Sequence, residues 1–120
     1  MAKSILLISR QAPWSGPGAR EALDIVLAGG AFDLPIGLLF LDDGVFQLTA
    51  GQSAKAVQQK DLSANLQALP MFGVEDLFLC ADSAAERAIA TDTLALDGVA
   101  VLTAPDIAAL IDRYDQVITL

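Results

Sequence analysis

Apolar residues in this chain gather in five short runs that are separated by polar or helix-like segments. Within each run the apolar residues are consecutive rather than alternating, as expected for strands that are buried on both faces of a sheet. Strands that alternate with helices are typical of a mostly parallel sheet covered by helices. The predicted strands are Ser4–Ser9, Ile36–Leu41, Leu77–Cys80, Val99–Leu102 and Val117–Leu120.

About four helices are predicted between these strands, from apolar residues at helical spacing. They are Arg20–Leu27, a stretch whose buried face carries Leu62, Leu66 and Leu69, then Ser83–Ala90 and Asp106–Arg113. The pair Gly29-Gly30 is expected to stop the first helix, and Pro70 with Gly73 the second. We therefore expect a three-layer α/β/α fold with a five-stranded, mostly parallel sheet.

The chain has 120 residues, a length that suits one domain over residues 1–120. Hydrophobic residues make up 54% of it, which exceeds the usual globular share. Either a sheet buried on both faces or a surface committed to partner subunits explains this excess. The sequence is compatible with both explanations at once.

The charge of the chain limits its partners. Seven Lys and Arg face fifteen Asp and Glu, which gives a formal net charge of −8, and the basic residues are scattered. Nucleic-acid binding needs clustered cations to neutralise phosphates, so direct binding of tRNA or DNA is not expected. The absence of histidine removes the commonest general base and metal ligand, and we expect neither a metal nor a cofactor.

A single cysteine, Cys80, excludes an internal disulfide and a zinc site built from several cysteines. The apolar stretch near the N-terminus ends at Ser9 and Arg10, which is too short for a secretory signal. No run approaches the length of a membrane span. We therefore expect a cytoplasmic protein without a membrane partner.

Two segments resemble ligand-binding motifs without matching them. Gly16-Pro17-Gly18 precedes the first helix, but Glu21 stands where a dinucleotide-binding loop needs a small residue and would repel a pyrophosphate. Asp42 and Asp43 follow the second strand and could coordinate a cation. Beside Gly44, however, such a pair is more typical of a solvated turn, so no metal site is predicted.

Cys80 is the one candidate for covalent chemistry, because it ends the third strand just before a helix. The positive end of a helix dipole favours a thiolate or persulfide. Asp82 and Glu86 lie close by in sequence and oppose that effect. Cys80 is therefore either a sulfur carrier or a small buried apolar residue at a strand end.

Four segments, in matching order along nearly the whole chain, resemble the TusC/DsrF branch of the DsrE-like family. The most specific is Asp43-Gly44-Val45-Phe46-Gln47-Leu48, with Gly51-Gln52 close behind. The others are Ala12-Pro13 followed by Gly18-Ala19-Arg20-Glu21-Ala22-Leu23-Asp24, Leu79-Cys80-Ala81 ahead of Glu86-Arg87, and Tyr114-Asp115-x-Val117-Ile118. The resemblance implies the DsrE-like fold.

The resemblance also implies a subunit of a sulfurtransferase complex. Members of this branch assemble with TusB-like and TusD-like paralogues, or their DsrH-like and DsrE-like counterparts, commonly as a dimer of heterotrimers. These complexes pass persulfide sulfur toward tRNA wobble 2-thiouridine or act in sulfur oxidation. The principal sulfur-carrying cysteine of the family is on the TusD/DsrE-like subunit, and Cys80 occupies the corresponding position here. An accessory subunit is thus expected, and a free-standing thiol or redox carrier that works through Cys80 is the alternative.

Val45, Phe46 and Leu48 follow the Asp42–Gly44 turn, where a domain that works alone would more often place polar residues. An exposed apolar cluster of this kind would suit a contact with another subunit. The alternative is that Phe46 folds back and covers the edge of the sheet.

Overall fold

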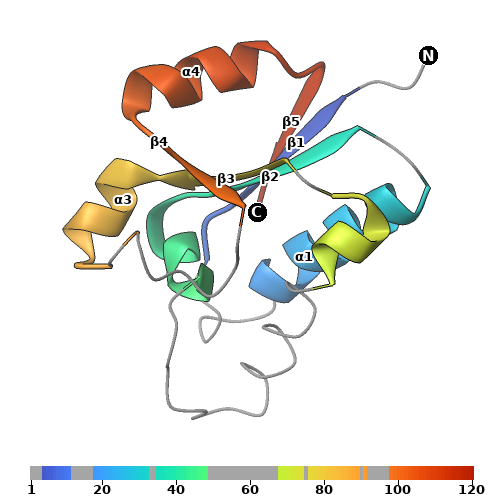
Figure 1. Cartoon of the computed structure of the whole chain (residues 1–120), viewed down its shortest axis with the longest axis horizontal. Helices are drawn as coiled ribbons and strands as arrows, with labels where there is room; N and C mark the ends of the chain where they lie inside the picture. The colour runs from blue at the N-terminus through green and yellow to red at the C-terminus, as the bar shows by residue number, and fades with distance from the viewer. Residues whose placement is uncertain are drawn as a thin grey trace, which may run out of the picture.

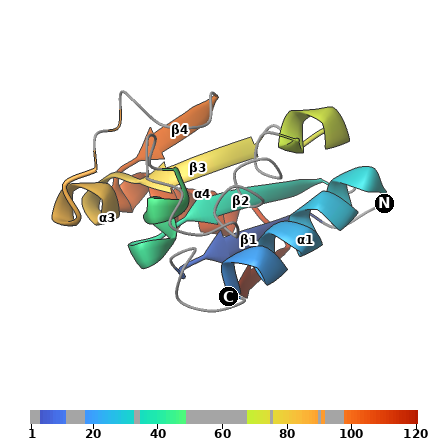
Figure 2. The same cartoon turned by 90° about the horizontal axis from the view of Figure 1, so that it is seen from below.

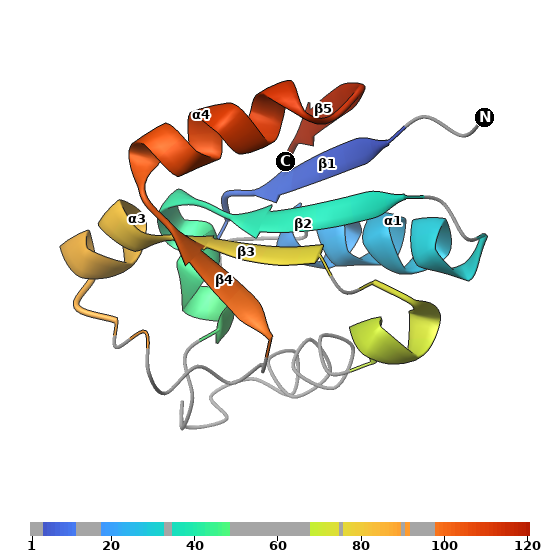
Figure 3. The same ribbon diagram turned by 45° about the horizontal axis from the view of Figure 1, so that its top comes forward.

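A computed structural model describes residues 4–11, 18–32, 35–48, 68–74, 76–89, 91 and 98–120 of the chain. A five-stranded sheet lies at its centre, and all of its neighbouring strands pair in parallel. The strands follow the order β4-β3-β2-β1-β5, so the chain builds outward from β1 to β4 and then crosses to the other side of β1 (Figure 3). The strand bounds are β1 Ile5–Ser9, β2 Ile36–Phe40, β3 Asp76–Cys80, β4 Val99–Leu102 and β5 Gln116–Thr119.

Helices cover both faces of this sheet (Figures 1 and 2). Helix α1, Gly18–Ala31, packs its apolar stripe on one face, and α4, Ala104–Asp112, packs on the other. The α1 side includes the buried residues Leu7, Ala22, Leu23, Val26, Leu38, Phe40, Leu77 and Leu79, and the α4 side includes Leu6, Ile8, Leu39, Cys80, Ile107 and Leu110. Successive residues of β1, β2 and β3 thus enter opposite cores, which explains their unbroken apolar runs. The expected burial on both faces was wrong for β4 and β5, which are the edge strands and are partly or fully exposed. The predicted three-layer fold is confirmed.

Helix α1 is longer than the sequence predicts. It continues through Gly29 and Gly30, which are both buried, and the amide of Phe32 still bonds the carbonyl oxygens of Ala28 and Gly29. A Cβ atom added at Gly29 would lie 3.0 Å from Cδ1 of Ile36 on β2. A glycine inside a helix costs only about 1 kcal/mol relative to alanine, and the burial of the apolar stripe of α1 on the sheet outweighs that cost. The prediction that these glycines stop the helix was wrong.

The carboxyl ends of the strands lead into short helices. The 3-10 helix η1, Asp42–Leu48, follows β2, and α3, Ala81–Glu86, begins directly after β3. Figure 1 shows η1, drawn in green, beside α3 at this end of the sheet. The sequence predicts a turn where η1 lies, and this prediction was wrong. It also predicts a helix after β3, but that helix begins and ends earlier than expected and is shorter.

Some sequence predictions fall on residues outside the described ranges. These are the loop at residues 12–17, the segment Gly51-Gln52 and most of the second predicted helix, including Leu62 and Leu66. Leu69 is described: it is fully buried and begins the 3-10 helix η2, Leu69–Phe72, which contains Pro70. Within the described ranges, no helix is both long and apolar enough to cross a membrane.

Candidate functional site at the carboxyl end of the sheet

Strand β3 places Cys80 at the carboxyl end of the sheet. Because side chains alternate along a strand, Cys80 points to the α4 side, where it joins an apolar cluster with Leu39 and Ile107. Cys80 is 5% exposed. It is also the residue that caps the N-terminus of α3, since its Sγ accepts a hydrogen bond from the amide of Ser83 at 3.4 Å. The thiol is therefore held by packing and by a backbone donor.

A second hydrogen bond connects this cap to η1. The amide of Asp42 donates to Oγ of Ser83 at 3.0 Å, and Ser83 is itself buried. Asp42 has a positive φ of 52°, a conformation that aspartate tolerates better than most residues. Ser83 thus bonds both Cys80 and Asp42, so the end of β3 and the start of η1 are held together.

The two carboxylates at the start of η1 pair with arginines. Nε and Nη2 of Arg10 each lie 2.7 Å from Oδ2 of Asp42. Nε of Arg87 lies 2.9 Å from Oδ1 of Asp43, and its Nη1 donates to the carbonyl oxygen of Ser83 at 3.2 Å. The hydrogen bond to Asp43 is the main cause that raises the pKa of Arg87 above its ordinary value, so Arg87 is cationic at any physiological pH.

These ion pairs affect whether Asp42 and Asp43 could coordinate a cation. Both carboxylates face guanidinium groups, and Nη1 of Arg87 also lies 3.5 Å from Oε2 of Glu86, one of the two acids close to Cys80 in the sequence. Within the described residues, no group of three or more potential metal-ligating side chains occurs. The ion pairs of Asp42 and Asp43 therefore favour a structural role for these residues near the end of β3.

Gln47 fastens η1 to the end of β1. Its Nε2 donates to Oγ of Ser9 at 2.7 Å and to the carbonyl oxygen of Gln11 at 3.0 Å, and both Ser9 and Gln47 are buried. Gly44 packs so tightly that an added Cβ atom would overlap the carbonyl of Ser9. Together with Ser83, these contacts connect the ends of β1, β2 and β3.

The structure corrects the exposure expected of the apolar residues in η1. Val45 and Leu48 are fully buried in the α1-side core of this chain, so they form no exposed cluster. They stand three residues apart on a 3-10 helix, which turns both toward the sheet. Phe46 is partly exposed, and its role in a subunit contact stays a prediction.

Sequence reasoning missed most of the polar network. Cys80, Asp42 and Asp43 were considered, whereas Ser9, Arg10, Gln47 and Ser83 were not given a role at this site. Gln47 offered a signal, since it is a polar residue inside the apolar segment Val45–Leu48. The others could not be identified, because their partners are 32 to 41 residues away along the chain.

These features define a small three-layer α/β protein whose single thiol closes the third strand of a parallel sheet. A sequence model of the DsrE/DsrF-like family matches residues 3–120, and the chain belongs to this family. Its similarity to both TusC and DsrF proteins supports the TusC/DsrF branch.

Two curated relatives and one solved structure illustrate this similarity. The chain is 65% identical to "Protein TusC homolog" of Pseudomonas aeruginosa over 120 residues, which cover 100% of both chains. It is 39% identical over 92 residues to "Intracellular sulfur oxidation protein DsrF" of Allochromatium vinosum, covering 77% of this chain and 68% of that protein. The crystal structure of the ychN protein from E. coli, at 24% identity, superposes with a TM-score of 0.77 and covers 100% of both chains, which shows the shared fold.

Proposed function

We propose that this chain is an accessory subunit of a hetero-oligomeric sulfur-relay complex, assembled with TusB-like and TusD-like paralogues. The observation that carries this proposal is the 65% identity to a TusC homologue along the entire chain. The similarity to DsrF, whose name refers to intracellular sulfur oxidation, supports the same class of function. The greater similarity to the TusC homologue favours a relay that ends in tRNA wobble 2-thiouridine.

The accessory role rests on the environment of Cys80. Sulfur transfer requires a thiolate that can attack the donor, and therefore a sulfur atom that the donor can reach. Cys80 is 5% exposed, packs against apolar side chains and accepts the amide of Ser83. A free-standing thiol carrier would need an accessible sulfur, so the burial of Cys80 favours a partner subunit as the principal carrier.

The polar network suggests what the chain contributes instead. Ser9, Gln47 and Ser83 are buried and bond across three strand ends, and Arg10 and Arg87 pair with Asp42 and Asp43 at the surface above them. Such a network fixes the shape of this edge of the sheet. We infer that the edge is a preformed surface for the complex rather than a reaction centre.

Copurification tests this proposal. The gene cluster that encodes the chain is expressed with only this chain tagged, and the eluate is analysed by mass spectrometry and by size-exclusion chromatography with light scattering. We expect TusB-like and TusD-like chains in equal amounts with the tagged chain. Recovery of the tagged chain without either paralogue would contradict the proposal.

Phe46 is the contact residue to test within that complex. If it lies in the core of an interface, Phe46→Asp should cost about 2 kcal/mol, which is roughly a 30-fold loss of affinity. Phe32→Asp is the matched control, because Phe32 is 80% exposed and lies at the end of α1, on a different element from Phe46. Unchanged assembly with a folded Phe46→Asp chain would remove Phe46 from the interface.

A further inference from the structure

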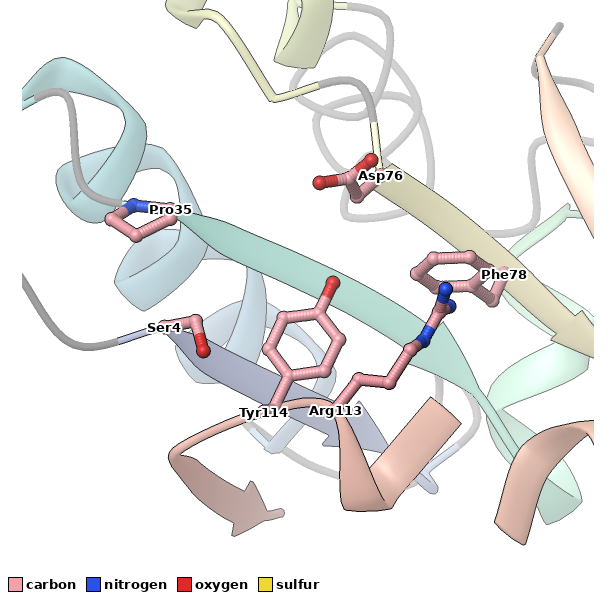
Figure 4. Close-up of a pocket in the computed structure, with 6 residues that line it drawn as sticks. All are labelled: Ser4, Pro35, Asp76, Phe78, Arg113 and Tyr114. Atoms are coloured by element: carbon pink, nitrogen blue, oxygen red, sulfur yellow. The ribbon is translucent and has the colours of Figure 1, made fainter. Parts of the chain in front are cut away.

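A concave site lies at the opposite end of the sheet from Cys80. It is a pocket of about 300 Å³ between the end of α4 and the amino ends of β1, β2 and β3 (Figure 4). Its lining residues are Ser4, Pro35, Asp76, Phe78, Arg113 and Tyr114. The volume is at the lower end of the range for small-molecule sites, so the pocket suits a ligand of few atoms.

The wall that α4 contributes is held in place by backbone contacts. After α4 ends, Asp115 and Ser4 form three hydrogen bonds. Oδ2 of Asp115 accepts from the amide of Ser4 at 2.9 Å and from its Oγ at 3.3 Å, and the amide of Asp115 donates to Oγ of Ser4 at 3.0 Å. The ring of Tyr114 lies over Gly37 of β2, where an added Cβ atom would overlap the hydroxyl group. The absence of a side chain at Gly37 thus makes room for Tyr114 across the sheet.

Besides Ser4, which bonds Asp115, three side-chain polar groups border this pocket. They are the carboxylate of Asp76, the guanidinium of Arg113 and the hydroxyl of Tyr114. Among the residues that the structure describes, none of these three groups makes a hydrogen bond or an ion pair. In Figure 4, Arg113 extends toward the ring of Phe78, and the Tyr114 hydroxyl points across β2 toward the side of Asp76. Asp76 and Arg113 are exposed and Tyr114 is partly buried, so one anionic carboxylate, one cationic guanidinium and one neutral hydroxyl donor are available to a ligand.

The protonation of Tyr114 suits the role of donor. Burial is the main cause that raises its pKa above 10.0, and the charge of Asp76 acts in the same direction. The phenol therefore keeps its proton at neutral pH and can donate a hydrogen bond.

We propose that this pocket binds a small zwitterion of the class represented by a free α-amino acid. Arg113 binds the carboxylate with its planar donor fork, and Tyr114 donates a further hydrogen bond to it. Asp76 accepts from the ammonium group, and Phe78 provides an apolar surface for the side chain.

The charge pattern favours a zwitterion over simpler ligands. An anion alone would gain from Arg113 but lie close to Asp76, and a cation alone would meet the converse difficulty. A ligand that carries both charges satisfies both groups at once. The site uses neither Cys80 nor the network around it, so the proposal is independent of the sulfur-relay function.

Titration of the full-length chain by ¹⁵N NMR tests this proposal, with L-leucine as the probe. Isovalerate and isopentylamine are the matched controls, since each keeps the branched apolar group and one of the two charges. We expect saturable shifts of the amide signals of Asp76, Phe78, Arg113 and Tyr114 with L-leucine, and much weaker shifts with either control. No saturable shift at these amides with L-leucine, or equal affinity for isopentylamine or isovalerate, would overturn the proposal.

Variants identify the groups that hold each charge. Asp76→Asn and Arg113→Gln should each weaken the binding of L-leucine roughly tenfold or more, because each removes a charge-assisted hydrogen bond. Arg20→Gln is the matched control, since Arg20 pairs with Asp24 on the exposed face of α1, and it should bind like the original chain. If folded Asp76→Asn and Arg113→Gln chains bind L-leucine as tightly as the control, the site is not the one proposed. Should a variant fail to fold, the comparison of the three ligands on the original chain still decides.

Discussion

At the scale of single residues, Cys80 has a structural duty that a serine can perform. Its side chain accepts the amide of Ser83 at the start of α3, and serine is one of the preferred residues at such a position. Cys80→Ser places a hydroxyl in the same apolar cluster, but that hydroxyl finds the same donor. We expect the free energy of unfolding to stay within about 1 kcal/mol of the original chain, as measured by urea denaturation.

Cys80→Ala serves as the comparison for that measurement. It keeps a small apolar side chain and removes the acceptor, so it should be the less stable variant of the two. If Cys80→Ala were the more stable variant, the role of Cys80 would be packing alone and not capping of α3.

Tyr114 offers a direct test of its surroundings, because it is the only tyrosine in the chain. Its pKa is raised by burial and, to a smaller extent, by Asp76, so its ultraviolet absorbance should show ionisation above pH 10.0. The folded state holds this proton more tightly than the unfolded state does. The associated stability is therefore complete below the unfolded pKa of about 10 and is lost as the pH rises through the folded pKa.

Asp76→Asn separates the two causes of this shift. It removes the neighbouring charge and leaves the burial, so the absorbance transition should move down only part of the way. A transition at or below the ordinary value in the original chain would contradict the partial burial of the ring.

At the scale of elements, substitution of two glycines compares a contact with backbone, at Gly44, with a contact with a side chain, at Gly29. Gly44→Ala brings a methyl group onto the backbone of Ser9, and backbone cannot yield as a side-chain end can. We expect a loss of about 1–3 kcal/mol in the free energy of unfolding, measured by urea denaturation. Gly29→Ala is the matched control, since it meets only the end of the Ile36 side chain and gains about 1 kcal/mol of helix propensity.

Gly29→Ala should leave the free energy of unfolding unchanged or raise it. A Gly44→Ala chain that is as stable as the Gly29→Ala chain would contradict the contact between η1 and β1.

The same elements show how far the sequence could predict the fold. All five strands were predicted within a residue of their ends. For β1, β2 and β3 the reason is burial on both faces, which leaves a continuous apolar run, whereas β4 and β5 are apolar but partly or fully exposed in this chain. The length of α1 was not predicted, since the low helix propensity of Gly29 and Gly30 is overcome by packing on the sheet. The helix η1 was not predicted either, because Asp42-Asp43-Gly44 resembles a turn. The hydrogen bonds of η1 to Ser9 and Ser83 join parts of the chain that are distant in sequence.

The candidate site was predictable to a similar degree. The position of Cys80 at a strand end before a helix is confirmed. Its burial agrees with one of the two interpretations offered by the sequence, but the contribution of α4 was beyond local reasoning, because Ile107 is 27 residues further along the chain. The ion pairs of Arg10 with Asp42 and of Arg87 with Asp43 were missed for the same reason.

At the scale of the whole molecule, the net charge governs which partners the chain can bind alone. With a formal charge of −8 and scattered cations, it has little capacity to replace the counterions around tRNA. We expect no measurable tRNA binding by the isolated chain near physiological salt, as tested by filter binding beside a basic tRNA-binding protein as positive control. Micromolar binding that weakens as salt is added would contradict this expectation.

The accessory role in a sulfur relay is tested most directly by following sulfur through the assembled complex. The complex is incubated with a persulfide donor, the added sulfur is mapped by mass spectrometry, and transfer to the acceptor is timed with the original chain and with Cys80→Ser. We predict that the added sulfur resides on a partner subunit, that Cys80 stays unmodified, and that Cys80→Ser transfers sulfur at the original rate. A persulfide on Cys80 that passes to the acceptor, and whose loss in Cys80→Ser abolishes transfer, would contradict the account and make this chain a sulfur carrier.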